Sequence, residues 1–467
     1  MNYFLDARRI VVLSIVGGAF AIAWPTIASA QIPDASAPSA SDPVVDGGPP
    51  AMPVKNQAYA IHGQSTLVVQ SNLPFRSRFE GANSLRSTGE TRETADLTLY
   101  LGVRPWAGAE IWINPELDQG FGLRNTLGAA GFPNGEAYKV GKRNPYLRLQ
   151  RAFIRQTINL GGEEEKVAPD LNQLGGAGTA NRMVLTFGKF SVSDIFDTNA
   201  YAHDPRADFL NWTVIEAGTF DYAADAWGYS LGGAAELYLG RWAMRGGLFN
   251  LSTVPNGEHL EKGFGQYELV GEIEERHSVG GHPGKLRITG FLNHGMMGRL
   301  SEATNLSALN GQAADVSLVR RFATRAGISL NLEQELTASL GFFVRAGIAD
   351  GRYEAFEFTD VDRTFSAGLS IAGKTWGRAD DRLGLAIVVN GASPARKRYL
   401  DAGGLGVLIG DGRLPQPGDE DIVEAYYECS IAQGLHVTPD FQLLYHPAYN
   451  RDRGPVAVLG VRLHGQF

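Results

Sequence analysis

The sequence predicts an all-β protein, a transmembrane antiparallel β-barrel of about 16 strands with long extracellular loops and an inward-folded constriction loop. Three observations lead to this prediction. From Tyr59 onward, apolar and polar residues alternate with a period of two, as they do in strands with two different faces. The predicted strands are mostly ~9–13 residues long, which matches the ~9–11 residues needed to cross a bilayer at a tilt. Finally, long and short connections alternate along the chain.

The alternation assigns each strand an apolar and a polar face. In the stretch 95–104, Leu97, Leu99 and Leu101 share one face, and Thr98 and Tyr100 share the other. A soluble β-sandwich would need shorter strands, and a β-helix would show a repeat of fixed period, which this chain lacks. The predicted strands span residues 59–70, 93–104, 108–116, 146–158, 181–190, 227–238, 241–251, 265–277, 285–296, 322–334, 337–349, 363–373, 381–391, 421–432, 435–446 and 455–467.

The connections predict which end of the barrel faces which compartment. With an even strand number and both termini at one end, every short turn is periplasmic and every long connection extracellular. Trp106, Trp242 and Trp376 lie in or beside predicted periplasmic turns, where an interfacial aromatic belt is expected. The exception is the connection 159–180, about twenty residues where this plan predicts a short turn. The long connections span 71–92, 117–145, 191–226, 297–321 and 392–420.

The N-terminus predicts export from the cytoplasm. Arg8 and Arg9 precede a short apolar run, and an Ala-Ser-Ala cleavage pattern follows at 28–30. We therefore interpret residues 1–30 as a signal peptide, 31–56 as a flexible Pro- and Ser-rich segment, and 57–467 as the barrel domain. The final strand ends on an aromatic residue, Phe467, as outer-membrane barrels commonly do.

Composition and motifs argue against catalysis and against cofactors. The net charge of −8 disfavours nucleic acid as a partner, and the single cysteine, Cys429, excludes an intrachain disulfide and a zinc site built on cysteines. The stretch 368–375 matches a phosphate-binding loop and 228–232 a nucleophile elbow, but neither is followed by the helix that its chemistry requires. Three histidines on the predicted 265–296 hairpin have no metal-binding spacing. We expect no enzyme activity, no metal and no cofactor.

Two predicted loops carry the strongest functional signal, because loops on a rigid scaffold usually carry function. Residues 114–141 and 188–212 are rich in Asp, Asn, Arg, Gly and aromatic residues. A sixteen-strand barrel is wide enough for an aqueous channel, so a long loop folded inward would narrow it.

Several long segments resemble the carbohydrate-selective outer-membrane porins of the OprB type, and the resemblance covers roughly 59–467. They include GAEIWINPELDQGFGLRNTLG, PYLRLQRAFIRQT, GKFSVSDIFDTNAYAHDPRADFLNW, DYAADAWGYSLG, EAFEFTDVDRTFSAG and PAYNRDRGPVAVLGVRLHGQF. The resemblance implies a Gram-negative outer-membrane porin that passes monosaccharides by facilitated diffusion. It places Glu116, Arg155 and Lys189 at an eyelet of arginines, acidic residues and aromatics, whereas Leu117 stands where some members have Arg.

The predicted partners are small sugars and outer-membrane lipid; monomer and homotrimer both remain open. The alternatives are a general, anion-selective or amino-acid-selective porin and, less favoured, a barrel enzyme. Each eyelet residue could instead be an ordinary solvated lumen residue, because large barrels have polar interiors. The predicted eyelet comprises Glu110, Trp112, Asn114, Glu116, Arg148, Arg155, Lys189, Asp194, Asp197 and Arg206.

Overall fold

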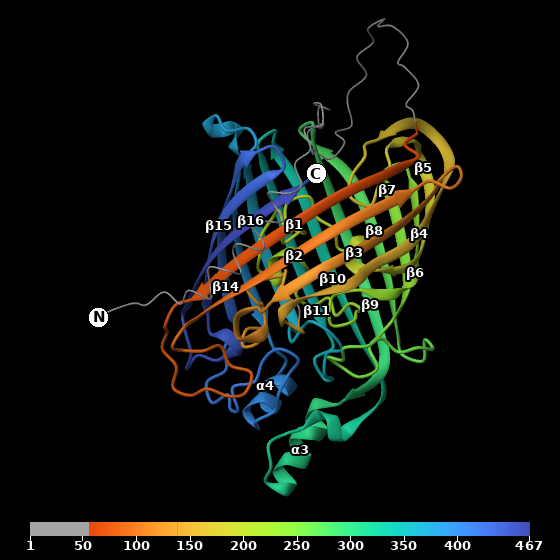
Figure 1. Ribbon diagram of the computed structural model, residues 1–467. Helices are drawn as coiled ribbons and strands as arrows, with labels where there is room; N and C mark the ends of the chain where they lie inside the picture. The colour runs from red at the N-terminus through yellow and green to blue at the C-terminus, as the bar shows by residue number, and fades with distance from the viewer. Residues whose placement is uncertain (1–55, 138) are drawn as a thin grey trace, which may run out of the picture. The chain divides into compact units, whose positions relative to one another are not determined.

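A closed antiparallel barrel of sixteen strands forms the body of the protein (Figure 1). The computed structural model describes residues 56–137 and 139–467. Each strand pairs with its neighbours in the chain, and β1 closes the barrel by pairing with β16, where Leu67 lies opposite Leu463. The predicted fold class is therefore confirmed. The predicted signal peptide, residues 1–30, and nearly all of the predicted segment 31–56 lie outside the described residues.

The strands match the predicted ones in number and order, with shifts at their ends. Two helices of eight residues or more, α3 (Leu300–Asn310) and α4 (Pro394–Asp401), lie in long connections, and the short α2 (Trp212–Ile215) lies in another. The strands are β1 (Tyr59–Asn72), β2 (Glu90–Val103), β3 (Ala109–Gly120), β4 (Lys142–Val167), β5 (Gly176–Phe190), β6 (Ser230–Leu239), β7 (Trp242–Asn250), β8 (Tyr267–Val279), β9 (His282–Gly298), β10 (Arg320–Thr337), β11 (Leu340–Ala349), β12 (Arg363–Ala372), β13 (Arg382–Gly391), β14 (Glu420–Ala432), β15 (Leu435–Tyr445) and β16 (Val456–Gln466).

The two faces of the sheet have opposite chemistry. On β2, Leu97, Leu99 and Leu101 are exposed on the outside, whereas Thr98 and Tyr100 are buried on the inside. An apolar exterior around a polar interior is the reverse of a soluble protein and suits contact with lipid. Among the described residues, no helix is both long and apolar enough to cross a membrane.

The two ends of the barrel differ as predicted. The long connections, with α3 and α4, lie at one end, and the short turns lie at the end where the chain terminates (Figure 1). Trp106, Trp242 and Trp376 are exposed in or beside short turns, while Phe322 and Phe365 are exposed near the opposite end. Two such aromatic bands are typical of membrane barrels.

The irregular connection 159–180 is mostly strand. β4 continues to Val167 and β5 starts at Gly176, so that only residues 168–175 are left as a turn. The β4–β5 pairing shifts register on both sides of Gly161, which bends this long hairpin. The sequence correctly predicted that this connection is unusually long for the end of the barrel with the short turns. Its length comes from extended strands rather than from a loop.

Glycines within the strands make room for inward aromatic rings. A Cβ atom on Gly102 would lie 2.4 Å from the Trp112 ring, and one on Gly327 would lie 2.4 Å from the Phe291 ring. Both distances are far below van der Waals contact, so each ring lies directly over the neighbouring strand's glycine. This close packing accounts for part of the high glycine content.

Candidate functional site

Two long connections fold into the lumen and narrow it. The first is loop 191–229, between β5 and β6, and the second is loop 121–141, between β3 and β4. Loop 191–229 reaches the far wall, where Arg462 of β16 donates hydrogen bonds to the carbonyl oxygens of Pro205 and Asp208, each at 2.7 Å. The predicted inward-folded loop is therefore confirmed, and loop 121–141 accompanies it.

Glutamates on the inner wall hold these loops by their backbones. The amide of Asp197 donates to Glu272 at 2.8 Å, and the amide of Gly131 donates to Glu420 at 2.7 Å. A loop buried inside a barrel needs acceptors for its N–H groups, and carboxylates on inward strand positions supply them. The alternation assigned Glu272 to the polar face of its strand but could not reveal this role, and Glu420 lies just before the predicted strand 421–432.

Arg206, on loop 191–229, lies close to three carboxylates. Its guanidinium is 3.3 Å from Glu136, 3.7 Å from Glu116 and 3.9 Å from Asp96. These three carboxylates come from loop 121–141, β3 and β2 respectively. Glu116 and Arg206 were both predicted, whereas Asp96 and Glu136 were missed because no local pattern connects three separate elements.

A second arginine, Arg151, was also missed, although it makes the best-formed ion pair of the site. Its Nε and Nη2 atoms bind the two carboxylate oxygens of Asp194 at 2.8 and 2.6 Å. Burial by itself would raise the pKa of Asp194, but attraction to Arg151 and its hydrogen bonds outweighs burial and lowers that pKa. The Asp194 side chain keeps 28% of its surface accessible, so the pair borders water.

A β-bulge on β4 lets residues of both parities face the lumen, so Arg148, Arg151 and Arg155 all lie on the inner side. Asn114 pairs with Arg151 while the next residue, Pro115, pairs with Leu149, so Gln150 is an extra residue on β4. Strict alternation would place Arg148 and Arg155 on opposite faces. The bulge turns the strand by one residue, and both then face the lumen.

Arg148 and Lys189 meet at an aspartate of loop 191–229. Arg148 Nη2 lies 3.3 Å and Lys189 Nζ 3.0 Å from the carboxylate of Asp225. The Arg148 guanidinium also lies 3.3 Å above the centre of the Trp227 ring, a cation–π contact. Both basic residues were predicted, and the segment that supplies Asp225 and Trp227 was part of the family resemblance.

Nearer the short-turn end, the turn 168–175 enters the lumen. Arg155 Nη1 donates to the carbonyl of Asn172 at 2.8 Å and lies 3.5 Å from Glu110. Asn114, in the middle of β3, donates to the side-chain oxygen of Asn172 at 2.9 Å. The Trp112 indole donates to Glu110 at 3.0 Å. The turn therefore covers this part of the inner wall.

The ten predicted residues do not form one ring. Arg148, Lys189 and Asp194 lie in one group, and Glu116 and Arg206 lie in a second. The third group consists of Glu110, Trp112, Asn114 and Arg155. Asp197 is fully buried and binds Arg345 at 3.2 Å and Asn331 at 2.7 Å, so it anchors the loop to the wall and lines no passage. Trp112 is likewise fully buried over Gly102.

Comparison with known proteins assigns the family. The model of the OprB family, described as carbohydrate-selective porin, matches residues 82–467. The chain belongs to the OprB family of carbohydrate-selective porins. Its family and fold are those of a channel of the Gram-negative outer membrane rather than of an enzyme. The long loops are accordingly extracellular, and the short turns face the periplasm.

Two relatives illustrate how far this OprB-family porin has diverged. Porin AaxA of Chlamydia abortus is 23% identical over 287 residues, covering 60% of this chain and 53% of that protein, so the match spans about half the relative's length. The high-pH structure of Pseudomonas putida OprB superimposes with a TM-score of 0.66 at 17% identity, covering 88% of this chain and 94% of that one. That likeness establishes the shared fold.

Proposed function

We propose that this porin lets neutral monosaccharides such as glucose diffuse passively through its narrowed lumen. The observation that carries the proposal is the series of arginines that face carboxylates along the inward loops, with Arg151–Asp194 as the clearest pair. Sugar hydroxyl groups both donate and accept hydrogen bonds. Arginine offers a fan of donors and a carboxylate offers acceptors, so facing pairs can replace the hydration shell of a sugar.

The proposed eyelet consists of Arg148, Arg151, Lys189, Asp194 and Arg206. Each of these side chains is mostly buried but partly accessible to solvent. The aromatic ring of Trp227 lies under Arg148 and orients it. Glu116 and Asn114 are fully buried and hold the arrangement in place from the wall. Glu110 and Arg155 extend the path toward the periplasm.

The charge balance favours neutral solutes over anions. A strongly anion-selective porin would present a ring of Arg or Lys. Here Arg206 is outnumbered by the carboxylates of Asp96, Glu116 and Glu136. An amino-acid channel stays the second candidate, because a zwitterion also presents both charges. The barrel-enzyme alternative loses support at Ser230, whose hydroxyl donates to the Asn250 carbonyl rather than to a base.

The test is a comparison of solutes of matched size. We expect millimolar glucose to reduce single-channel current and to swell porin-containing liposomes, while succinate does neither. Arg151→Gln should weaken the glucose effect without closing the pore. The Arg321→Gln variant serves as a control, because Arg321 makes a similar two-oxygen pair with Glu302 far from the eyelet, beside α3. Equal permeation of glucose and succinate would contradict the proposal.

We further propose that residues 1–30 are a cleaved export signal and that 31–56 link it to the barrel domain. Mass spectrometry of the outer-membrane protein should give a mature chain that begins at Gln31. One chain closes the barrel and supplies both inward loops, so each chain should carry its own passage in a monomer or in a homotrimer. Native mass spectrometry in detergent distinguishes the two assemblies.

A further inference from the structure

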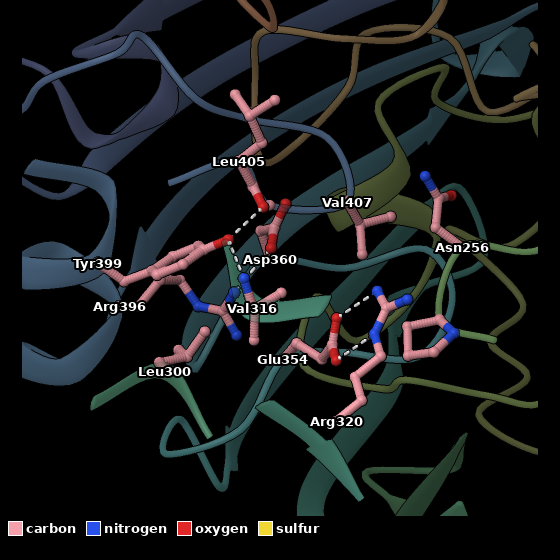
Figure 2. Close-up of a pocket in the computed structure, with 12 residues that line it drawn as sticks. Asn256, Leu300, Val316, Arg320, Glu354, Asp360, Arg396, Tyr399, Leu405 and Val407 are labelled. Carbon is pink, nitrogen blue, oxygen red and sulfur yellow. Dashed lines mark hydrogen bonds and ion pairs between the residues drawn. The ribbon is translucent and has the colours of Figure 1, made fainter. Parts of the chain in front are cut away.

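A small cavity opens among the extracellular connections, away from the eyelet residues. Its volume is about 180 Å³. Its walls come from four connections, 251–266, 299–319, 350–362 and 392–419, together with the first residue of β10. This volume is below the ~300–1,000 Å³ usual for drug-sized ligands, so the cavity suits a single small ring. Figure 2 shows the lining side chains, which include Asn256, Arg320, Glu354, Asp360, Tyr399 and Val407.

One side of the cavity is polar and held rigidly. Arg320 donates from Nε and Nη2 to the two oxygens of Glu354, each at 2.8 Å, and the Gly298 amide donates to the same carboxylate at 2.6 Å. The third guanidinium nitrogen, Nη1, is turned away from Glu354 (Figure 2) and binds no other described residue. Asn256 is exposed at the rim. The Arg320–Glu354 pair is fixed in place, and both Arg320 and the exposed Asn256 keep hydrogen-bonding capacity for a ligand.

The other side of the cavity is apolar. The ring of Tyr399 and the side chains of Val316 and Val407 line it and are otherwise buried. The Tyr399 hydroxyl is held because it donates to the Leu405 carbonyl at 3.0 Å and accepts from the Val316 amide at 3.4 Å. A pyranose has an apolar C–H face and a rim of hydroxyls, so it matches a cavity with one face of each kind.

The lining charges balance. Arg320 pairs with Glu354, and Arg396 binds Asp360 at 2.7 Å. Two arginines therefore face two carboxylates, leaving no net charge to attract an anion or a cation. A purely apolar ligand would desolvate the partly accessible Arg320 guanidinium without offering it a hydrogen bond. A neutral polyol meets both constraints.

The same connections support the eyelet. Within the connection 350–362, which supplies Glu354 and Asp360, the amides of Phe356 and Glu357 donate to Asp221 of loop 191–229 at 2.9 and 2.8 Å. The cavity is thus built on a segment that also holds the constriction loop, at the side from which solutes arrive.

We propose that this cavity is a capture site for one hexose ring at the extracellular entrance of the channel. The inference rests on the proposed sugar-porin function and adds a second, outer site to it. Its role is to raise the local concentration of sugar above the eyelet when external sugar is scarce.

The test measures glucose binding and pore function separately. Equilibrium dialysis of the detergent-solubilised full chain with labelled D-glucose gives the binding constants, and planar bilayers give the conductance in KCl without sugar. We expect Arg320→Met and Asn256→Gly each to weaken one class of glucose sites at least five-fold, with conductance unchanged. Asn256 lies exposed at the rim and has a φ of 60°, which glycine adopts without strain, so Asn256→Gly removes the side chain and keeps the loop conformation.

The matched control is Arg321→Met, because Arg321 is the next residue but pairs with Glu302 outside the cavity. Native glucose affinity in both Arg320→Met and Asn256→Gly, with glucose flux retained, overturns the capture site and leaves the sugar porin standing. A native channel that conducts ions but neither binds nor passes glucose overturns the proposed function, and the capture site with it.

Discussion

The Arg151–Asp194 pair gives the sharpest test of where solutes pass. Replacing Arg151 by Gln leaves Asp194 unpaired and adds one negative charge to the eyelet, while Asp194→Asn adds one positive charge. The double variant has the native net charge. If the pair borders the passage, Arg151→Gln should raise the preference for cations and Asp194→Asn should raise the preference for anions. The double variant should have the native selectivity.

The size of the shift follows from Coulomb's law. A unit charge ~6 Å from a permeating ion in a water-like medium contributes about 0.7 kcal/mol. That energy corresponds to roughly a threefold change in local ion concentration, which screening at ~0.1 M salt reduces to about twofold. With 12% of the Arg151 and 28% of the Asp194 side chain exposed, the water-like value is the lower bound of the interaction energy.

The assay is the reversal potential in a KCl gradient across a planar bilayer. An added negative charge enriches cations and depletes anions by about twofold each, so we expect Arg151→Gln to raise the cation-to-anion permeability ratio about fourfold. Asp194→Asn should lower the ratio by a similar factor, and the double variant should restore it. Arg321→Gln makes the same chemical change beside α3 and should leave the ratio unaltered. Identical reversal potentials in the native protein and both single variants would refute the placement of the passage beside this pair.

Three further outcomes are expected. Arg206→Gln should raise cation preference at least as much as Arg151→Gln, and should lower barrel stability by about 3 kcal/mol because buried carboxylates lose their partner; thermal unfolding followed by circular dichroism measures the loss. Asn172→Ala should raise single-channel conductance, because it loosens the turn 168–175 that enters the lumen: it removes a hydrogen bond from Asn114 worth ~1 kcal/mol and strains a residue with φ of 56°. Gln173→Ala loses only a hydrogen bond within the turn and should leave conductance unchanged. The pKa of Asp194 is lowered, so its ion pair is complete above the ordinary carboxyl pKa of ~3.9 and is lost only as pH falls through the lowered value; the reversal-potential difference between native and Asp194→Asn should therefore stay constant from pH 8 to pH 5.

Some of the site could be predicted because it depends on local patterns. Residue composition identified the loops containing Asp194 and Arg206, and the family resemblance identified Lys189 and Arg155. Other residues depended on register. The bulge at Gln150 reverses which side chains of β4 face inward, and the alternating pattern around it does not predict the reversal.

The fold was determined largely by the sequence alone. An alternating strand between lipid and water has only one favourable orientation, because a one-residue slip would turn every apolar side chain toward water. Strand number, the two faces and the two ends of the barrel follow from that local constraint.

Only the tertiary structure decided which lumen residues meet. Arg206 gathers carboxylates from three elements, and Asp197 proved to be an anchor rather than a pore residue. These contacts join residues far apart in the chain, and polar side chains are common at inward positions all around a large barrel. Polarity therefore places a residue inside the barrel, whereas the path of the two inward loops determines whether it borders the passage or supports the wall.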